Sequence, residues 1–346
     1  MPRVINTANN YIAIGENIHA TRALRRDGKR VETLADGTEG VPFKDIQGES
    51  HLLNVPEHFK KTQPYEQGQI KHFMIAIWKG VHGNADDQEQ GAKYVVQEAQ
   101  RQEKAGARFL DLNVDEVSYD LAEQKRAMQW LVKTVQKVAT VPLSIDSSNS
   151  EIIAEGLAAY DGVAGSPLLN SVALERVDAL DLVERYNSHV MLTAASADGM
   201  PEDAEDRLEN AGRLIEETMK RGIEPDRVYI DPLAFPISVS KEYGRHFLDA
   251  VTLIRTHFGN DIHISGGMSN VSFGLPKRLL INDVFIHLAI EHGSDSGIID
   301  PLNSTVSKII RLDMKSGPVR LATAMLLGDD EFCTNYIQAY REGRLG

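Results

Sequence analysis

Short apolar runs alternate with amphipathic stretches along most of this chain. The apolar runs are nearly continuous, as in residues 141–147 (VPLSIDS), which is typical of strands buried on both faces. The stretches between the runs repeat apolar residues at helical spacing, and Ala92, Val95, Val96 and Ala99 fall on one face of such a stretch. The pattern therefore predicts an α/β protein in which strands and helices alternate.

Eight strand–helix units can be placed on the 346 residues. The predicted strands cover residues 11–17, 107–115, 141–147, 167–172, 188–195, 227–233, 261–264 and 296–301. The predicted helices cover residues 86–105, 121–138, 150–160, 177–186, 201–221, 241–258 and 279–292, and a last helical region follows the eighth strand. Eight units without a dinucleotide-type break favour a closed (β/α)8 TIM barrel, and an open doubly wound sheet is the alternative.

Residues 21–83 interrupt this alternation after the first strand. They are mostly polar and rich in Gly and Pro, with an Arg/Lys cluster at residues 22–30 and one apolar piece at residues 73–78. Such a passage is too short and polar to carry a sizeable core of its own. We therefore expect a single domain over residues 1–346, with an insertion at residues 21–83 and a C-terminal helical extension at residues 322–327 and 332–340.

Charge and cysteine content narrow the classes of function. The net charge is −13 and the pI is near 5.3, which argues against a nucleic-acid or anionic-membrane partner. The single cysteine, Cys333, excludes an intrachain disulfide and a thiolate metal cage. No apolar run reaches membrane-spanning length, and residues 1–20 lack the apolar core of a signal peptide. The chain is therefore expected to be cytoplasmic.

Polar residues follow almost every predicted strand. In a barrel, the carboxyl ends of the strands and the loops after them build the active site. The residues at these positions are Glu16, Asn17, Asp111, Asn113, Asp146, Asn170, Thr193, Asp231, Asn270 and Asp300. Each could instead cap a helix or start a turn, but a cap does not require an apolar run before it at nearly every strand. Carboxylates and carboxamides dominate the set, which suits a neutral, planar, hydrogen-bonding heterocycle.

The turn at residues 265–276 (SGGMSNVSFGLP) is the most distinctive of these strand ends. Gly266 and Gly267 allow a close approach to the backbone, and the Asn270 amide can both donate and accept hydrogen bonds. The alternative is that Ser269 and Asn270 only turn the chain and cap the next helix.

Several of these motifs together resemble the pterin-binding methyltransferases. The motifs are YIAIGEN, LDLNVD, PLSIDSSN, LLNSV, YIDPL and GGMSNVS, and they occur in this order at residues 11–20 and within 86–310. The resemblance is to methyltetrahydrofolate:corrinoid protein methyltransferases, with the folate domain of cobalamin-dependent methionine synthase and dihydropteroate synthase as broader relatives. It implies a TIM barrel, often a homodimer, that binds tetrahydrofolate or methyltetrahydrofolate at the carboxyl ends of its strands.

The resemblance also implies roles for individual residues. Asp146, Asn170 and Asp231 would hold the pterin ring, with Asn113 and Glu16 nearby, and Asn270 would hydrogen-bond N5. Arg278 matches an arginine that lies near this asparagine in the family. We expect Asn270 and Asp231 to be the catalytic residues, because a hydrogen bond that strengthens as charge develops on N5 favours methyl transfer.

The implied reaction moves a methyl group between a corrinoid protein and N5 of tetrahydrofolate, in a demethylation or one-carbon pathway. One alternative is a dihydropteroate synthase-like enzyme, but the strand ends lack the Lys/Arg set that a pterin diphosphate requires. Another is a non-catalytic folate-binding subunit of a demethylase complex.

Other histidine patterns give no cobalt or metal site. Residues 261–266 fit the D-x-H-x-x-G pattern of a cobalamin lower ligand, but they overlap the seventh strand, so we expect a separate protein to carry the corrinoid. His19, His51, His58, His72 and His82 lie in or beside the insertion with no standard ligand spacing, and no metal is expected. The Arg/Lys cluster could meet an acidic partner or the folate tail, or could form a solvated face.

Overall fold

The computed structural model describes residues 10–196 and 199–345, which fall into two compact units. One unit runs from Gly15 to Leu168, and the other combines the residues before Gly15 with those from Leu169 onward. The boundaries cut through strands β1 (Ile12–His19) and β9 (Leu168–Val172), so each of these strands contributes to both units.

The unit of residues 15–168 contains three neighbouring strands in the order β8-β7-β1. Strand β7 spans Phe109–Asn113 and β8 spans Leu143–Asp146, and the two pair in parallel. Helices α3 (Ala85–Lys104), α4 (Leu121–Val135) and α5 (Ser150–Ala159) alternate with them. Leu110, Leu112, Leu143 and Ile145 are fully buried, as expected for strands covered on both faces.

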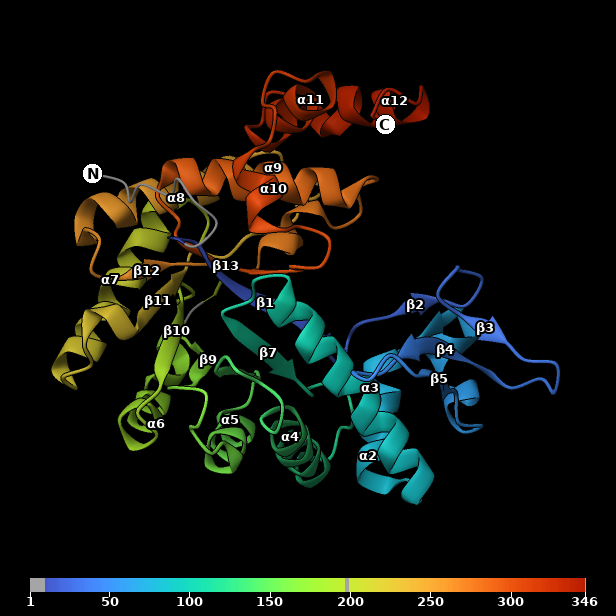
Figure 1. The fold of residues 1–346 in the computed structure, drawn as a ribbon. Coiled ribbons are helices and arrows are strands. Elements are labelled where there is room, and N and C mark those ends of the chain that lie inside the picture. Colours follow the sequence, from blue (N-terminus) through green and yellow to red (C-terminus); the bar gives the residue numbers. More distant parts are fainter. Residues whose placement is uncertain (1–9, 197–198, 346) are drawn as a thin grey trace. The chain divides into compact units, whose positions relative to one another are not determined.

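The insertion folds into small elements of its own. Strands β3 (Glu32–Thr33), β4 (Glu39–Lys44) and β5 (Ser50–Asn54) form an antiparallel sheet, and β2 (Leu24–Arg25) pairs with β6 (Gln69–Ile70). Two short helical turns follow β5, namely η2 (Phe59–Lys61) and α1 (Gln63–Glu66). The apolar piece at residues 73–78 lies in helix α2 (His72–His82), which packs on α3 and α4 (Figure 1).

The other unit continues the alternation of strands and helices. Strands β9, β10 (His189–Thr193), β11 (Val228–Asp231) and β12 (His263–Ile264) are successive neighbours, and β10–β11 and β11–β12 pair in parallel. A parallel bridge between Gly267 and Ile298 brings β13 (Ser296–Ile299) beside the turn after β12, and the Ile12 N–H donates to the Asp295 carbonyl. The helical elements are η3 (Leu174–Ala179), α6 (Leu180–Arg185), α7 (Ala204–Lys220), η4 (Pro225–Arg227), α8 (Tyr243–Phe258), η5 (Met268–Ser272), α9 (Arg278–His292), α10 (Val306–Ile310), α11 (Gly317–Leu326), η6 (Glu331–Cys333) and α12 (Thr334–Arg341).

The predicted elements occur in the predicted order, with shorter ends. All eight predicted strands are present, and α11 and α12 form the predicted C-terminal extension. The seventh strand shortens to two residues, because residues 261 and 262 still belong to the bend that follows α8. Within residues 10–196 and 199–345, no helix combines the length and apolarity needed to cross a membrane.

Candidate functional site

Asn113 and Asp146 form a bonded pair at the carboxyl ends of β7 and β8. The parallel register sets the two residues opposite each other. Asn113 Nδ2 donates to Asp146 Oδ2 over 2.8 Å, and Asn113 Oδ1 accepts the Asp115 backbone N–H over 3.0 Å. Asn113 is buried, whereas the Asp146 side chain remains about a quarter exposed. The pair therefore presents an oriented carboxylate that can accept N–H groups from a planar heterocycle.

Asp146 does not cap the helix that follows it. The cap of α5 is Asn149, whose side chain accepts the Glu151 backbone N–H over 2.8 Å. Ser147 and Ser148 instead donate their hydroxyls to the Asp115 carboxylate. The helix-cap interpretation of Asp146 is therefore wrong.

His19, at the end of β1, lies beside Asp146, which its sequence position beside the insertion does not predict. Its Nε2 is 3.6 Å from Asp146 Oδ2. Burial lowers the pKa of His19, but the Asp146 carboxylate, with smaller contributions from Asp111 and Glu16, raises it above 6.5 on balance. No sequence motif marks this contact, because it joins two strands that are far apart in the chain.

Glu16 and Asn17 point to different surroundings. The Glu16 carboxylate accepts a bond from Arg22 Nη2 over 2.9 Å, which neutralises it locally. Asn17 Nδ2 donates to Glu98, and its backbone N–H donates to the Gln102 side chain, so Asn17 is bound to α3. Of the two, Glu16 is the one whose carboxylate lies near His19.

Asp231 ends β11 in the other unit as a deeply buried carboxylate. Its Oδ1 accepts the Leu233 backbone N–H over 2.8 Å, and the Gly267 backbone N–H also donates to the carboxylate. Burial raises the pKa of Asp231 above its ordinary value, although the two backbone bonds and the charge of Arg207 oppose this shift. A buried carboxyl group with a raised pKa is typical of a functional site.

The Gly266–Gly267 turn lies between Asp231 and Asn270. A Cβ on Gly266 would come within 3.1 Å of Asp231 Oδ1, and one on Gly267 would come within 2.9 Å of Asn270 Nδ2. The glycines therefore make room for these two side chains, which lie against adjacent residues of one turn. Among the described residues, the exposed Asn270 amide has no hydrogen-bond partner, which leaves it available to a ligand.

Arg278 holds the turn that carries Asn270. Its Nη2 donates to the Ser269 carbonyl over 2.9 Å, its Nε donates to the Ser272 hydroxyl over 3.0 Å, and its guanidinium lies over the Phe273 ring. Helix α9 begins at Arg278 without a side-chain cap, so the cap interpretation of Ser269 and Asn270 is also wrong.

Arg207 supports the loop after β11. Its Nε donates to the Pro232 carbonyl over 2.7 Å, and its Nη1 donates to the Asp203 carbonyl over 2.5 Å. The side chain is fully buried beside the Phe235 ring. Arg207 therefore fixes the backbone next to Asp231.

The remaining strand-end residues differ in their surroundings. Asn170 is buried on β9. The Asp300 carboxylate accepts the Leu302 backbone N–H and the Asn303 amide, which is the turn-forming role considered as an alternative for it. Each of the two units thus has its own polar set at strand carboxyl ends.

A cavity of about 790 Å³ lies between the insertion and the loop after β7, within the unit of residues 15–168. Its lining includes the apolar residues Phe59, Ile70 and Met74 and the aromatic residues Tyr65 and Tyr119. Asp115, which bonds Asn113, also lines it. The insertion therefore shapes a cavity close to the Asn113–Asp146 pair.

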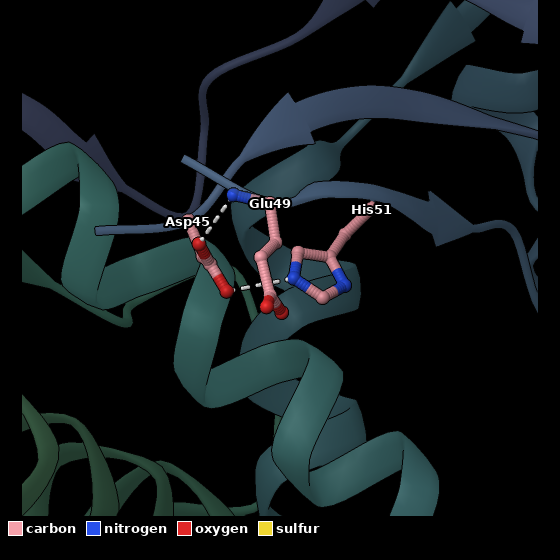
Figure 2. A group of neighbouring side chains, drawn as sticks. All are labelled: Asp45, Glu49 and His51. Carbon is pink, nitrogen blue, oxygen red and sulfur yellow. Dashed lines mark hydrogen bonds and ion pairs between the residues drawn. The ribbon is translucent and has the colours of Figure 1, made fainter. Parts of the chain in front are cut away.

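Asp45, Glu49 and His51 are grouped in the insertion, as Figure 2 shows. One potential ligand atom from each lies within 4.8 Å of the others. The Asp45 carboxylate already accepts the Glu49 backbone N–H and bonds the His51 imidazole over 2.8 Å, and Lys93 Nζ is 3.7 Å away. These contacts account for the group as a turn-stabilising network.

His263, in the D-x-H-x-x-G pattern, lies on β12 as predicted. Its Nδ1 bonds Asp295 over 2.8 Å, and its ring stacks on Tyr229 with centroids 4.5 Å apart. Both contacts give the imidazole a structural role within the sheet.

Comparisons with known proteins bear on the family and the fold of this chain. Residues 85–300 match the family described as pterin binding enzyme. The methylcorrinoid:tetrahydrofolate methyltransferase of Eubacterium limosum is 30% identical over 267 residues, which cover 75% of this chain and 91% of that protein.

Solved structures of dihydropteroate synthases share the fold. The enzyme of Stenotrophomonas maltophilia superposes with a TM-score of 0.52 at 16% identity, covering 65% of this chain and 86% of that one. The enzyme of Xanthomonas albilineans in complex with 7,8-dihydropteroate gives 0.52 at 21% identity, covering 63% and 83%. These similarities, together with the eight strands, confirm the predicted (β/α)8 barrel fold. The match over residues 85–300 and the similarity to the Eubacterium limosum methyltransferase show that the chain belongs to the pterin-binding enzyme family.

Proposed function

We propose that this protein is a methyltransferase that moves a methyl group from a corrinoid carried by a separate protein to N5 of tetrahydrofolate. The relative from Eubacterium limosum, named for this reaction, supports the substrates and the direction. The observation that carries the proposal is the arrangement of Asp231 and Asn270 against the Gly266–Gly267 turn. This arrangement offers a carboxyl group and an uncommitted amide at neighbouring positions.

The pterin ring would be held by acids and amides at the strand ends. Asp146, positioned by Asn113, can accept two parallel N–H bonds from the amidine-like edge of a pterin. By the motif match, Asn170 and Asp231 read further polar atoms of the ring. Binding by several fixed groups orients N5 for an in-line displacement at the methyl carbon.

Asn270 would act on N5 itself. In the proposed direction, the N5–carbon bond forms as the cobalt–carbon bond breaks, and N5 loses its proton to solvent. An amide that bonds N5 more strongly as its charge changes lowers the barrier rather than only tightening binding. Arg278, which hydrogen-bonds the same turn, would keep the amide in place.

A second protein would supply the corrinoid. When bound, the corrinoid provides the cobalt that carries the methyl group. The insertion, with its cavity near Asn113 and Asp146, could cover the bound folate or form part of the surface that the partner protein contacts. A homodimer is a further prediction from the family resemblance.

Three cations near the candidate residues are engaged within the protein. Arg22 bonds Glu16, Arg207 bonds two backbone carbonyls, and Arg278 bonds its own turn. A dihydropteroate synthase needs cations for a pterin diphosphate, so these commitments favour the methyltransferase.

A spectroscopic assay tests the proposal. Tetrahydrofolate and an excess of free methylcobalamin are mixed with the protein, and loss of the cobalt–carbon absorption is followed together with N5-methyltetrahydrofolate formation. We expect protein-dependent demethylation. Product formation only from a pterin diphosphate and aminobenzoate would overturn the proposal in favour of a synthase, and folate binding without turnover would indicate a non-catalytic subunit.

Asn270→Ala tests the assigned chemistry. We expect turnover to fall by about 10²–10³-fold, the effect of removing one preorganised donor, while the Kd for tetrahydrofolate changes only a few-fold. Asn335→Ala, an exposed residue of α12, is the matched control and should change neither. Equal losses in turnover and binding would make Asn270 an ordinary binding residue.

A further inference from the structure

The His19 imidazole is held on both sides. On one side, its Nδ1 lies 2.7 Å from the Thr21 hydroxyl and accepts the Thr21 backbone N–H over 3.2 Å. On the other side, its Nε2 faces Asp146 Oδ2 at 3.6 Å. The imidazole therefore bridges a backbone turn and the carboxylate that ends β8.

These contacts determine which nitrogen carries the proton in the neutral form. Because Nδ1 accepts a backbone N–H, the proton resides on Nε2, the atom that faces Asp146. Asn113 Nδ2 and His19 Nε2 both approach Oδ2 of the carboxylate. Among the described residues, no side chain bonds Asp146 Oδ1, so a pterin N–H can approach that oxygen without competition.

The surroundings of His19 are mainly acidic. Asp146 on β8, Asp111 on β7 and Glu16 on β1 all favour the charged imidazole, and together they raise the pKa of His19 against the effect of burial. The nearby cations are engaged elsewhere, because Arg22 bonds Glu16, and Lys71 bonds the Thr21 carbonyl and Glu116. A protonated His19 therefore has a nearby carboxylate partner in Asp146, and its Nδ1–H can donate to the Thr21 hydroxyl oxygen 2.7 Å away.

We propose that His19 is a positioning residue of the pterin site, whose imidazole holds the Asp146 carboxylate in one orientation toward the pterin ring. This inference rests on the proposed function, in which Asp146 binds the ring. His19 does not touch the reacting atoms. It acts through Asp146, so its loss weakens folate binding more than it slows the chemical step.

The pH dependence follows from the sign of the shift. A histidine with a raised pKa makes its full contribution at low pH, and that contribution declines as pH rises through the raised value. We therefore expect wild-type affinity for tetrahydrofolate to decline as pH rises through the His19 pKa, and His19→Gln to lose that pH dependence. At pH 6, His19→Gln should weaken affinity by about tenfold, as expected for the loss of a charge-assisted contact.

The test is a titration of tetrahydrofolate binding between pH 5.5 and 9, with the imidazole pKa of His19 followed by NMR in the same samples. Asp146→Asn should lower the His19 pKa and weaken folate binding. Thr21→Val should weaken binding modestly and Thr21→Ser should restore it, because serine keeps the hydroxyl at Nδ1. His82→Gln, which removes another histidine–carboxylate pair of the same unit, should leave binding unchanged.

The outcomes separate this inference from the proposed function. If Asp146→Asn weakens binding but His19→Gln follows the wild-type pH profile, the positioning role is wrong and the pterin site stands. If His19→Gln lowers only thermal stability, its role is structural and the inference also fails. If neither wild type nor Asp146→Asn binds tetrahydrofolate, the proposed function itself fails.

Discussion

Asp231, which we propose binds the pterin, opposes the stability of the folded state. Its carboxylate is buried, and two backbone N–H groups and the charge of Arg207 only partly compensate for the water it has lost. The folded state therefore binds a proton at Asp231 more tightly than the unfolded chain does. We therefore propose that Asp231 serves ligand binding rather than stability.

Asp231→Asn should therefore be at least as stable as the wild type at neutral pH but impaired in folate binding. Because the folded pKa is raised above 3.8, the wild-type free energy of unfolding decreases as pH rises from 3.8 through the folded pKa. The asparagine has no charge to desolvate, and its Oδ1 can still accept the Leu233 N–H.

Thermal melts between pH 3 and 8 and tetrahydrofolate titrations check this prediction. The variant should equal or exceed the wild-type Tm at pH 7, lose that advantage near pH 3, and bind folate about tenfold or more weakly. Asp249→Asn, an exposed carboxylate on α8, is the control and should show neither effect. A large drop in Tm at pH 7 would instead mean that the ionised carboxylate is a net stabilising group.

Single residues differ in how far the sequence predicts their surroundings. The pairing of Asn113 with Asp146 could be anticipated, because both residues end successive strands that a parallel sheet sets side by side. The contact between His19 and Asp146 could not, since the two residues end strands that are not neighbours in the order β8-β7-β1. The hydrogen bond from Arg278 to the Ser269 carbonyl likewise depends on the path of the backbone in η5, which composition does not specify.

At the scale of elements, α2 is the part of the insertion that joins it to the α-helical layer. It packs on α3 and α4, and two glycines make these contacts close. A Cβ on Gly80 would come 1.9 Å from Trp130 Cζ2, and one on Gly91 would come 2.3 Å from the Ala76 carbonyl oxygen. The helices therefore touch where only glycine fits.

Gly80→Ala should destabilise the protein by about 1–3 kcal/mol or more, because the rigid Trp130 ring must move to admit the methyl group. Gly212→Ala in α7 is the matched control. Its Cβ would meet only Phe258 at an ordinary 3.6 Å, and alanine improves helix propensity by up to about 1 kcal/mol. Urea unfolding measures both variants. A Gly80→Ala protein as stable as Gly212→Ala would show that Trp130 yields without cost.

The regular elements were predictable and the insertion was not. The predicted strands and helices rest on continuous apolar runs and helical periodicity, and their order matches the structure. In the insertion, β2, β3 and β6 are two residues each, too short for periodicity to mark. The fold of that segment depends on contacts with α2 and α3, which a local pattern does not contain.

At the scale of the whole molecule, the candidate pterin residues come from both compact units. Glu16, Asn113 and Asp146 belong to residues 15–168, and Asn170, Asp231 and Asn270 belong to the other unit. A (β/α)8 barrel gathers the carboxyl ends of its strands at one mouth. The proposed function assigns residues of both units to pterin binding, so it predicts that tetrahydrofolate couples the stabilities of the two units.

Hydrogen exchange with and without tetrahydrofolate tests this coupling. With ligand at 100 times its Kd, amides that exchange through global unfolding should slow by about a hundredfold in both units, including β8 and β11. Asp146→Asn and Asp231→Asn should each reduce this protection in both units, because either change weakens binding of the same ligand. Aminobenzoylglutamate, which lacks the pterin ring, is the control and should protect neither unit. Protection confined to one unit would place the pterin entirely within that unit and remove half of the proposed residues from the site.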